Sequence, residues 1–304
     1  MYRIIKRTLV LAGGLLGAVA LSATAYALVQ ARAFDASMQK QYAIALSTVT
    51  TSTAPEVLAR GKHLTESLGG CTSHDCHGSD LSGGRTVKMG PVGTYAGPNI
   101  TSGGILGVYT DGELMRLVKH GVKKDGQSVR VMTVQDFYWL PDSDVAAMIS
   151  YLRSVPKTDK PSGSTKVGIL GKVLDRQDKF HWDIARIVEQ LPQAAVPPPN
   201  PTASYGRFVV RMCTGCHGET LSGGRIPGAP PSMPIPVNIT PHESGIKDYT
   251  FDDFVRVLRT GTRKDGRLLD PFMTIDLTRN LDETELKALW AELQERPPKA
   301  FGGR

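Results

Sequence analysis

A pair of sequence blocks that recur at an almost constant spacing constrains this 304-residue chain more than any other feature. The segment Leu81-Ser82-Gly83-Gly84-Arg85 recurs at residues 221–225, and Asn99-Ile100-Thr101 recurs at residues 238–240. The sequence Asp-Gly at residues 125–126 also recurs, at residues 265–266. An offset this constant over about 95 residues is typical of a duplicated structural unit. The chain is therefore predicted to contain two copies of one domain of about 100 residues each.

The repeat places two cysteine–histidine segments in register. Residues 213–217 read Cys-Thr-Gly-Cys-His, and Cys-x-x-Cys-His is the signature of c-type haem attachment. In this chemistry Cys213 and Cys216 form thioethers with the haem vinyl groups, and His217 binds the iron as its proximal ligand. The other segment, residues 71–77, ends in the same way, but four residues separate its two thiols. Since its histidine precedes His217 by the same offset as the other repeated blocks, haem c is predicted at both segments, the upstream ligands being Cys71, Cys76 and His77.

Two alternative interpretations apply to these cysteines. Cys71 and Cys76 could form a disulfide, and Cys213 with Cys216 could form a thioredoxin-like redox pair. The redox pair requires a βαβ context, which the flanking sequence does not show. All four cysteines of the chain lie in these two segments. The sequence therefore leaves no cysteine for a structural disulfide elsewhere or for a separate catalytic thiolate.

Two methionines are candidates for the second axial ligand of each iron. Met132 follows His77 at the same spacing, to within one position, as Met273 follows His217. A buried methionine is ordinarily adaptable core filler. The matched spacing in both copies instead favours ligation, and a thioether ligand raises the potential of haem iron. The remaining histidines have no counterpart in the other copy and are not expected to be ligands; they are His63, His74, His120, His181 and His242.

Each copy predicts three helices. Thr53, with Pro55 and Glu56, matches a capping box that opens a helix ending near residues 69–70, and the equivalent helix begins at about Thr202. The middle helices are predicted to begin after Thr110 and Thr250 and to stop at glycines, Gly121 and Gly261. The last helices carry apolar residues at i, i+3, i+4 and i+7, namely Val145, Met148, Ile149 and Leu152 in one copy and Leu286, Leu289, Trp290 and Leu293 in the other.

The first 32 residues predict export. Arg3, Lys6 and Arg7 precede an uncharged run of about 23 residues, which is long enough to span a bilayer with the amino terminus in the cytoplasm. The alternative is a cleaved signal peptide, with a peptidase site at Ala25-Tyr26-Ala27. We favour a retained membrane anchor over residues 1–32, followed by a polar stalk over residues 33–52. Both interpretations place the remainder of the chain outside the cytoplasm.

The predicted domains are residues 53–155 and 202–304, with a linker over residues 156–201. The linker contains one amphipathic helix that is expected to pack the two domains together; the alternative is that it docks on a partner or on the membrane. Its apolar face consists of Phe180, Ile184, Ile187, Val188 and Leu191. A spacer with five prolines follows at residues 192–201, and proline-rich spacers of this kind are semi-rigid.

The formal charge of +7 does not indicate a nucleic-acid partner. Three of the basic residues belong to the amino-terminal segment, and two haems add roughly four propionate charges of opposite sign, so the exported part is close to neutral. Basic turns precede each candidate axial methionine, at residues 123–126 and 263–266. These turns are either ordinary solvated residues or a docking site for an acidic redox partner.

These features resemble the class I cytochrome c fold in two tandem copies. They resemble more closely the membrane-anchored dihaem cytochromes and the multi-haem cytochrome subunits of bacterial periplasmic dehydrogenases. The resemblance covers residues 55–155 and 203–298 and rests on the Cys-His segments, the Asn-Ile-Thr loop and the late methionine. The four-residue gap between Cys71 and Cys76 departs from the family pattern. The resemblance implies an all-α fold and two covalently bound haem c groups, one held by Cys71, Cys76, His77 and Met132 and the other by Cys213, Cys216, His217 and Met273.

The predicted function follows from this ligation. Iron with histidine and methionine ligands has no vacant position for a substrate, so the chain is expected to carry electrons and not to be an enzyme. Its expected partners are redox proteins, including a periplasmic dehydrogenase subunit and a membrane-side acceptor, and the bacterial cytoplasmic membrane itself. The alternative is a haem enzyme, such as a dihaem peroxidase or a thiosulfate-oxidising cytochrome.

Overall fold

The computed structural model describes residues 2–192, 196–227, 229 and 231–304. The first half of the described chain contains α1 (Tyr2–Ser37), α2 (Pro55–Glu66), β1 (Val87–Lys88), η1 (Gly90–Val92), β2 (Gly93–Tyr95), η2 (Ile105–Gly107), α3 (Asp111–His120), η3 (Val134–Asp136) and α4 (Asp142–Ser154). The second half contains β3 (Lys166–Val167), α5 (Ile169–Arg176), α6 (Ile184–Glu189), α7 (Ala203–Val209), α8 (Arg211–His217), α9 (Phe251–Thr260), α10 (Ile275–Thr278) and α11 (Glu283–Glu295).

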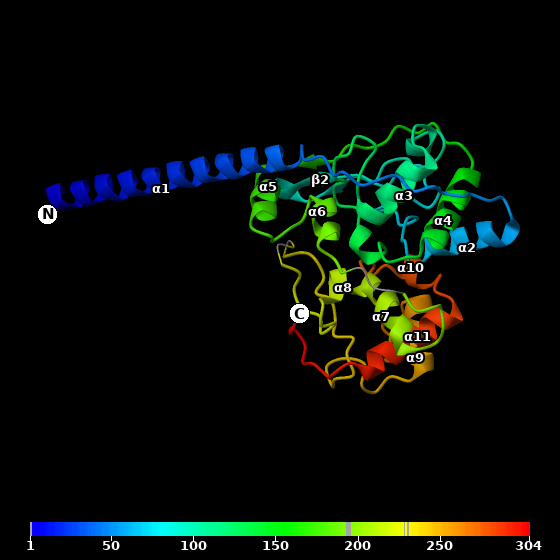
Figure 1. The fold of residues 1–304 in the computed structure, drawn as a ribbon. Coiled ribbons are helices and arrows are strands. Elements are labelled where there is room, and N and C mark those ends of the chain that lie inside the picture. Colours follow the sequence, from blue (N-terminus) through cyan, green and yellow to red (C-terminus); the bar gives the residue numbers. More distant parts are fainter. Residues whose placement is uncertain (1, 193–195, 228, 230) are drawn as a thin grey trace.

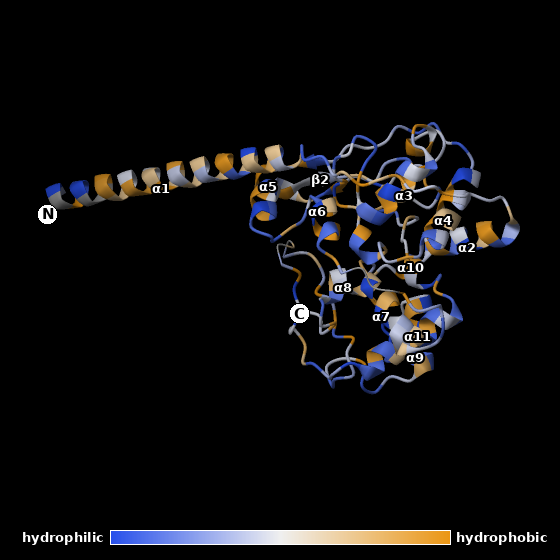
Figure 2. Ribbon diagram, viewed as in Figure 1, coloured by the Kyte–Doolittle hydropathy of each residue, from blue (hydrophilic) through white to orange (hydrophobic). Residues whose placement is uncertain are grey.

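The amino-terminal helix α1 projects from the rest of the molecule (Figure 1). Residues 10–26 of this helix are all exposed, and its colouring in Figure 2 is largely apolar between a hydrophilic start and a mixed end. By length and hydropathy, the stretch from Ile5 to Ser37 qualifies as a candidate membrane span near the amino terminus. A signal sequence meets the same criterion, so the structure establishes one apolar helix and not its topology.

Two helical units follow α1, and each is organised around a pair of crossing helices (Figure 1). In the first unit α2 packs on α4, and in the second α7 packs on α11. A glycine lies at each crossing: a Cβ atom on Gly61 would lie 2.0 Å from Ala147 O, and one on Gly206 would lie 2.1 Å from Ala288 O. Because any side chain there would collide with the facing backbone, the same close crossing is built into both halves.

The middle helices begin as predicted, whereas the first helix does not. The Thr110 hydroxyl accepts a hydrogen bond from Glu113 N while the Glu113 carboxylate accepts one from Thr110 N, and Thr250 forms the same capping box with Asp253. The predicted capping box at Thr53 is wrong. α2 has Ala54 as its N-cap with no side-chain hydrogen bond, and Pro55 occupies its first turn. Both middle helices end at glycines with left-handed backbone, Gly121 at φ 67° and Gly261 at φ 71°.

The fold is mostly helical, with one small sheet that the all-α prediction missed. β1, β2 and β3 form an antiparallel sheet in that order, with Val87 opposite Tyr95 and Thr94 opposite Lys166. β3 comes from the segment predicted as linker, which therefore folds back onto the first unit. The strands are two or three residues long, too short for the alternating pattern that predicts a strand from sequence.

The segments predicted as stalk and linker lie against the first unit. α1 extends to Ser37, and Tyr42, within the predicted stalk, is buried and donates its hydroxyl hydrogen to the Asp183 carboxylate. Phe34, Met38 and Trp182 form a small core between α1, the linker and the sheet. In the linker helix, α6, Ile184 and Val188 are buried, as the apolar face predicted. Part of the predicted proline spacer, residues 193–195, lies outside the described residues.

Candidate functional site

The two attachment segments present their histidines in the same way, although their backbones differ. Cys213, Cys216 and His217 lie on α8, whereas residues 71–77 form consecutive turns. His77 Nδ1 lies 2.8 Å from Pro98 O, and His217 Nδ1 lies 2.8 Å from Val237 O. Since a carbonyl only accepts, Nδ1 carries the proton in each ring. The lone pair of Nε2 is therefore free in both histidines, which is the arrangement that a second-shell carbonyl gives to a metal-binding imidazole.

Burial keeps both rings neutral. Desolvation lowers the pKa of His77 and of His217, while the carbonyl partner of each ring opposes this shift. A neutral imidazole is the form that binds a metal, because protonation would occupy the ring nitrogen that coordinates. The protonation state and the tautomer therefore both suit an axial ligand at these two positions.

The cysteine environments do not suit a redox-active pair. All four cysteines are free thiols in the structure. Burial raises the pKa of Cys71 and of Cys213 to about 12, and it also raises the pKa of Cys76 and Cys216. Reactive thiols in Cys-x-x-Cys redox motifs have lowered pKa values instead. Cys71 is buried and Cys213 is half-buried, whereas the second cysteine of each segment is exposed.

The repeated Leu-Ser-Gly-Gly-Arg and Asn-Ile-Thr sequences hold a loop beside each attachment segment. Leu81 and Leu221 both adopt φ of 60°, a left-handed conformation that is uncommon for leucine. Leu81 O accepts a hydrogen bond from Ile100 N, and Leu221 O accepts one from Ile239 N, each 2.9 Å long. The same unusual backbone thus occurs at the same place in both units. It holds the Asn-Ile-Thr loop, and the carbonyl that each histidine binds belongs to the residue immediately before that loop.

The asparagine of each Asn-Ile-Thr loop binds the chain that follows the unit's last helix. Asn99 Nδ2 donates to Thr158 O at 2.7 Å and to Lys160 O at 3.1 Å. Asn238 Nδ2 donates to Lys299 O at 2.7 Å. In both loops the asparagine Oδ1 also accepts hydrogen bonds from the backbone and hydroxyl of the threonine two residues later. These buried asparagines therefore hold a strap of chain, the residues that follow each last helix, against the Asn-Ile-Thr loop.

The candidate axial methionines lie in matching turns between the middle and last helices. Val134 N donates to Met132 O at 2.9 Å, and Ile275 N donates to Met273 O at 2.8 Å. Both methionine side chains are half-buried against the main core. Met273 in addition lines a cavity of about 540 Å³ that does not include His217. The geometry thus repeats the methionine turn in both units, and methionine ligation itself stays a prediction.

Each methionine loop packs on the attachment region of the other unit. The loop after Met132 reaches the second unit, where the rings of Trp139 and Phe208 lie 5.1 Å apart. Burial raises the pKa of Asp136, in the same loop, to about 7. The carboxylate of Asp136 lies close enough to Cys213 and Cys216 to raise their pKa values further, after the larger effect of burial.

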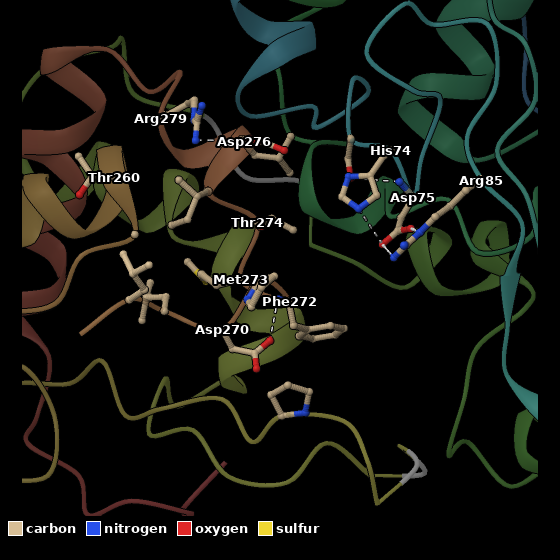
Figure 3. A pocket seen from close by; sticks show the side chains of 18 residues that line it. His74, Asp75, Arg85, Thr260, Asp270, Phe272, Met273, Thr274, Asp276 and Arg279 are labelled. Carbon is tan, nitrogen blue, oxygen red and sulfur yellow. Dashed lines mark hydrogen bonds and ion pairs between the residues drawn. The ribbon is translucent and has the colours of Figure 1, made fainter. Parts of the chain in front are cut away.

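The reciprocal contact involves the loop after Met273. Asn280 Nδ2 donates to Glu66 O at 2.9 Å, and the Leu277 side chain packs 3.1 Å from the position of a Cβ on Gly70, next to Cys71. The cavity lies in this contact. Figure 3 shows one wall formed by His74, Asp75 and Arg85 and the other by the loop that carries Asp270, Phe272 and Met273. The two attachment regions therefore both lie near the interface between the units, and each contacts the methionine loop of the other unit.

Several residues around these sites were not singled out by the sequence. The Arg304 guanidinium donates to Cys216 O at 2.6 Å and to Gly224 O at 2.9 Å, and it helps to lower the pKa of His217 after burial. Pro98 and Val237 could not be identified from the sequence, because only their backbone carbonyls bind the histidines. Asp136 aligns with a leucine when the two methionines are aligned, so the comparison of the two copies could not find it.

The histidines that are not expected to be iron ligands lie at different kinds of position. His74 is exposed in the cavity wall, and His120 is the last residue of α3. His63 lies 2.9 Å from Glu285 Oε1 in the other unit, a contact that has no equivalent in the repeat. The basic turns before each methionine bind backbone carbonyls nearby, Lys124 to Val108 O and Lys264 to Asp248 O.

Comparison with known proteins gives matches over part of the chain. No family model matches it. It is 36% identical over 93 residues to the cytochrome c subunit of a quinone alcohol dehydrogenase from Gluconobacter oxydans, covering 28% of this chain and 20% of that protein. It is 34% identical over 99 residues to the fructose dehydrogenase cytochrome subunit of Gluconobacter japonicus, covering 30% of this chain and 20% of that protein.

A third relative is of the same kind. The chain is 33% identical over 93 residues to the gluconate 2-dehydrogenase cytochrome c subunit of Pantoea cypripedii, covering 28% of this chain and 21% of the relative. The matches thus span about a fifth of the length of each relative. Over this part the chain is similar to cytochrome c subunits of bacterial dehydrogenases, which supports covalently bound haem c and a role in electron transport.

Proposed function

We propose that this chain carries two covalently attached haem c groups and transfers single electrons between redox partners at the outer face of the bacterial cytoplasmic membrane. In this proposal Cys71, Cys76, His77 and Met132 hold one haem, and Cys213, Cys216, His217 and Met273 hold the other. Each unit is a cytochrome c domain of class I type, over residues 53–155 and 202–304. The amino-terminal helix is a retained anchor.

One observation carries the proposal. Two histidines at equivalent places in a repeated sequence, His77 and His217, each direct Nδ1–H to a backbone carbonyl at 2.8 Å and keep a neutral Nε2 available. A single such histidine is a weak indication, since buried histidines commonly bind carbonyls. Two of them, each following a pair of cysteines and each flanked by the same strained leucine and the same asparagine-held strap, match the demands of two proximal ligands.

The residues around each site would bind and orient the cofactor. When bound, haem c supplies a one-electron iron couple. The cysteines would attach its edge, the carbonyl-bound imidazole would bind its iron, and the methionine would supply the second iron ligand. Because a methionine ligand raises the potential and leaves no open position, these residues favour electron transfer over substrate chemistry.

The packing of the units supports transfer between them. Each methionine loop contacts the other unit's attachment region, so the two proposed haems would face one shared interface. The partners are proposed by similarity to the relatives: a dehydrogenase subunit as electron donor and a membrane-side acceptor. Neither nucleic acid nor a separate catalytic reaction of this chain is part of the proposal.

A spectroscopic test separates an electron carrier from the haem-enzyme alternative. The purified full-length protein is oxidised and mixed with cyanide, and its absorption spectrum is followed. Six-coordinate, low-spin iron at both sites is expected to leave the spectrum almost unchanged at first. Rapid cyanide binding together with high-spin bands would show an open iron position and would favour a haem enzyme such as a peroxidase.

A further inference from the structure

The contact between α1 and α5 fixes how deep the amino-terminal helix can enter a bilayer. Tyr26 and Asp35 of α1 bind α5 at two points: Gln177 Nε2, just after α5, lies 3.2 Å from the Tyr26 hydroxyl, and Lys172 Nζ, within α5, lies 2.6 Å from Asp35 Oδ2. α5 therefore runs alongside the last third of α1, as Figure 1 also shows. The exposed side chains of Arg176 and Gln177 lie next to Tyr26 and would be costly in the hydrocarbon interior, so the level of Tyr26 lies outside that interior.

The part of α1 left for the membrane has the length that a bilayer requires. From Arg7 to Tyr26 the helix rises about 28 Å at 1.5 Å per residue, close to the ~30 Å of a hydrocarbon core. Within this stretch, residues 10–26 are exposed on every side. Beyond it, Ala31, Phe34 and Met38 pack against the first unit. Tyr26 thus lies at the boundary, where tyrosine is enriched in membrane helices.

The turn after α5 lies at this boundary and is basic. Arg176, Lys179 and His181 are exposed, and neither Arg176 nor Lys179 forms an ion pair with any residue that the structure describes. The acidic residue of the turn, Asp178, is neutralised by Arg186 at 3.2 Å. Phe180 of the turn packs against the buried Trp182, with ring centroids 5.2 Å apart.

We propose that the turn formed by residues 176–181 rests on the outer leaflet and binds the phosphate groups of anionic phospholipids. This inference rests on the proposed membrane anchorage of α1. Basic side chains next to a membrane span are attracted to anionic headgroups, and here two of them are presented at the boundary level by a folded element. The first unit would then be held in one orientation on the membrane, with the core around Trp182 packed against Val131, the neighbour of Met132.

The test uses the full-length holoprotein in lipid nanodiscs, with a spin label on His181→Cys. Since the four native cysteines are proposed to be bound to haem, this cysteine is the one available for labelling. Contact with a lipid-borne nickel chelate is measured by electron paramagnetic resonance. In nanodiscs containing phosphatidylglycerol we expect strong contact at position 181 and little at Val108→Cys, an exposed position on the same unit.

Charge removal decides whether the phospholipid is bound. Arg176→Gln with Lys179→Gln is expected to reduce the fraction in contact by roughly an order of magnitude in anionic nanodiscs, as is high salt. The matched variant Arg263→Gln with Lys264→Gln, in the second unit, should change nothing. Equal contact in phosphatidylcholine and phosphatidylglycerol, or no difference between positions 181 and 108, would overturn the proposal and leave the turn for a protein partner.

Failure of the anchorage gives a different result. A processed chain would lack residues 1–27 by mass spectrometry and would not co-elute with the nanodiscs, which contradicts both the anchorage and the lipid-binding turn. A protein that is retained in the nanodiscs while position 181 stays away from the lipid contradicts the lipid-binding turn alone.

Discussion

His63 Nε2 lies 2.9 Å from Glu285 Oε1, and this contact joins the first helix of one unit to the last helix of the other. Glu285 is 1% exposed. The same carboxylate accepts a hydrogen bond from Asp282 N, so it also caps α11. The buried carboxylate of Glu285 favours the protonated form of His63. The interface between the two units therefore contains a histidine whose pKa is raised by a carboxylate of the other unit.

The stability of the protein is expected to depend on the charge of His63. The hydrogen bond to Glu285 raises the pKa of His63, although burial opposes the shift. This contribution is complete below the unfolded value of about 6.5 and is lost as pH rises through the higher folded value. His63→Gln should lower the free energy of unfolding by about 2 kcal/mol at acidic pH, and the difference should shrink in alkaline solution. Denaturant titrations at several pH values measure it.

His120 provides a control of the opposite sign. Burial lowers the pKa of His120, so its protonation opposes folding at low pH. His120→Gln should therefore cause no loss of stability in acid. A His63→Gln variant whose loss is the same at all pH values would show that the contact with Glu285 is not charged.

The straps bound by Asn99 and Asn238 are expected to contribute equally to stability. Asn99→Ala and Asn238→Ala each remove a buried amide that binds the strap and the following threonine. Each is expected to cost about 2–3 kcal/mol, because the carbonyls of the strap lose their donor and the following threonine loses its acceptor. Gln39→Ala, which removes an exposed amide just after α1, should change the free energy of unfolding by less than about 0.5 kcal/mol. A large loss of stability in only one of the two asparagine variants would contradict equivalent roles for Asn99 and Asn238.

The helix crossings should tolerate no side chain. Gly61→Ala and Gly206→Ala each place a methyl group about 2 Å from a facing carbonyl oxygen. The helices must separate to accept it, at a cost of about 1–3 kcal/mol, as found for overpacked cores. Gly17→Ala, on the exposed part of α1 where nothing lies within 4 Å, is the control. Thermal unfolding that is unchanged in Gly61→Ala would mean that this crossing is looser than described.

Methionine ligation predicts a change of potential at one site at a time. Met132→Ala or Met273→Ala should lower one midpoint potential by on the order of 100 mV, leave the other in place, and abolish half of the methionine-to-iron charge-transfer absorption. A spectropotentiometric titration resolves the two couples. Met273→Ala is the more informative variant, because Met273 lines a cavity that does not include His217. An unchanged potential in Met273→Ala would show that another group, such as a histidine, occupies that position.

The repeat in the sequence predicted that equivalent helices and turns would occur in both halves. The repeated residues occupy caps and turns that have the same backbone conformation in each half. The capping boxes at Thr110 and Thr250 could be read from the sequence, since a threonine and an acid three residues later interact locally. The apolar faces of α4 and α11 could be read from their period of 3.6. Thr53 misled because the same residue pattern occurs one residue too early for the helix that forms.

The interface between the units could not be predicted from the repeat. The contacts of His63 with Glu285 and of Asn280 with Glu66 O join residues far apart in the sequence that have no counterpart in the other copy. The fold-back of the linker depends on β3, two residues whose pairing with β2 leaves no periodic signal. Carbonyl partners such as Pro98 O are likewise invisible, because every residue type has a carbonyl.

The number of haems per chain tests the central claim most directly. Pyridine haemochrome absorbance, divided by the protein concentration from amino-acid analysis, should give two haems for the full-length protein. Cys71→Ser with Cys76→Ser, and Cys213→Ser with Cys216→Ser, should each give one. A single haem in the unaltered protein, unaffected by one of these double substitutions, would contradict the proposal of two equivalent sites.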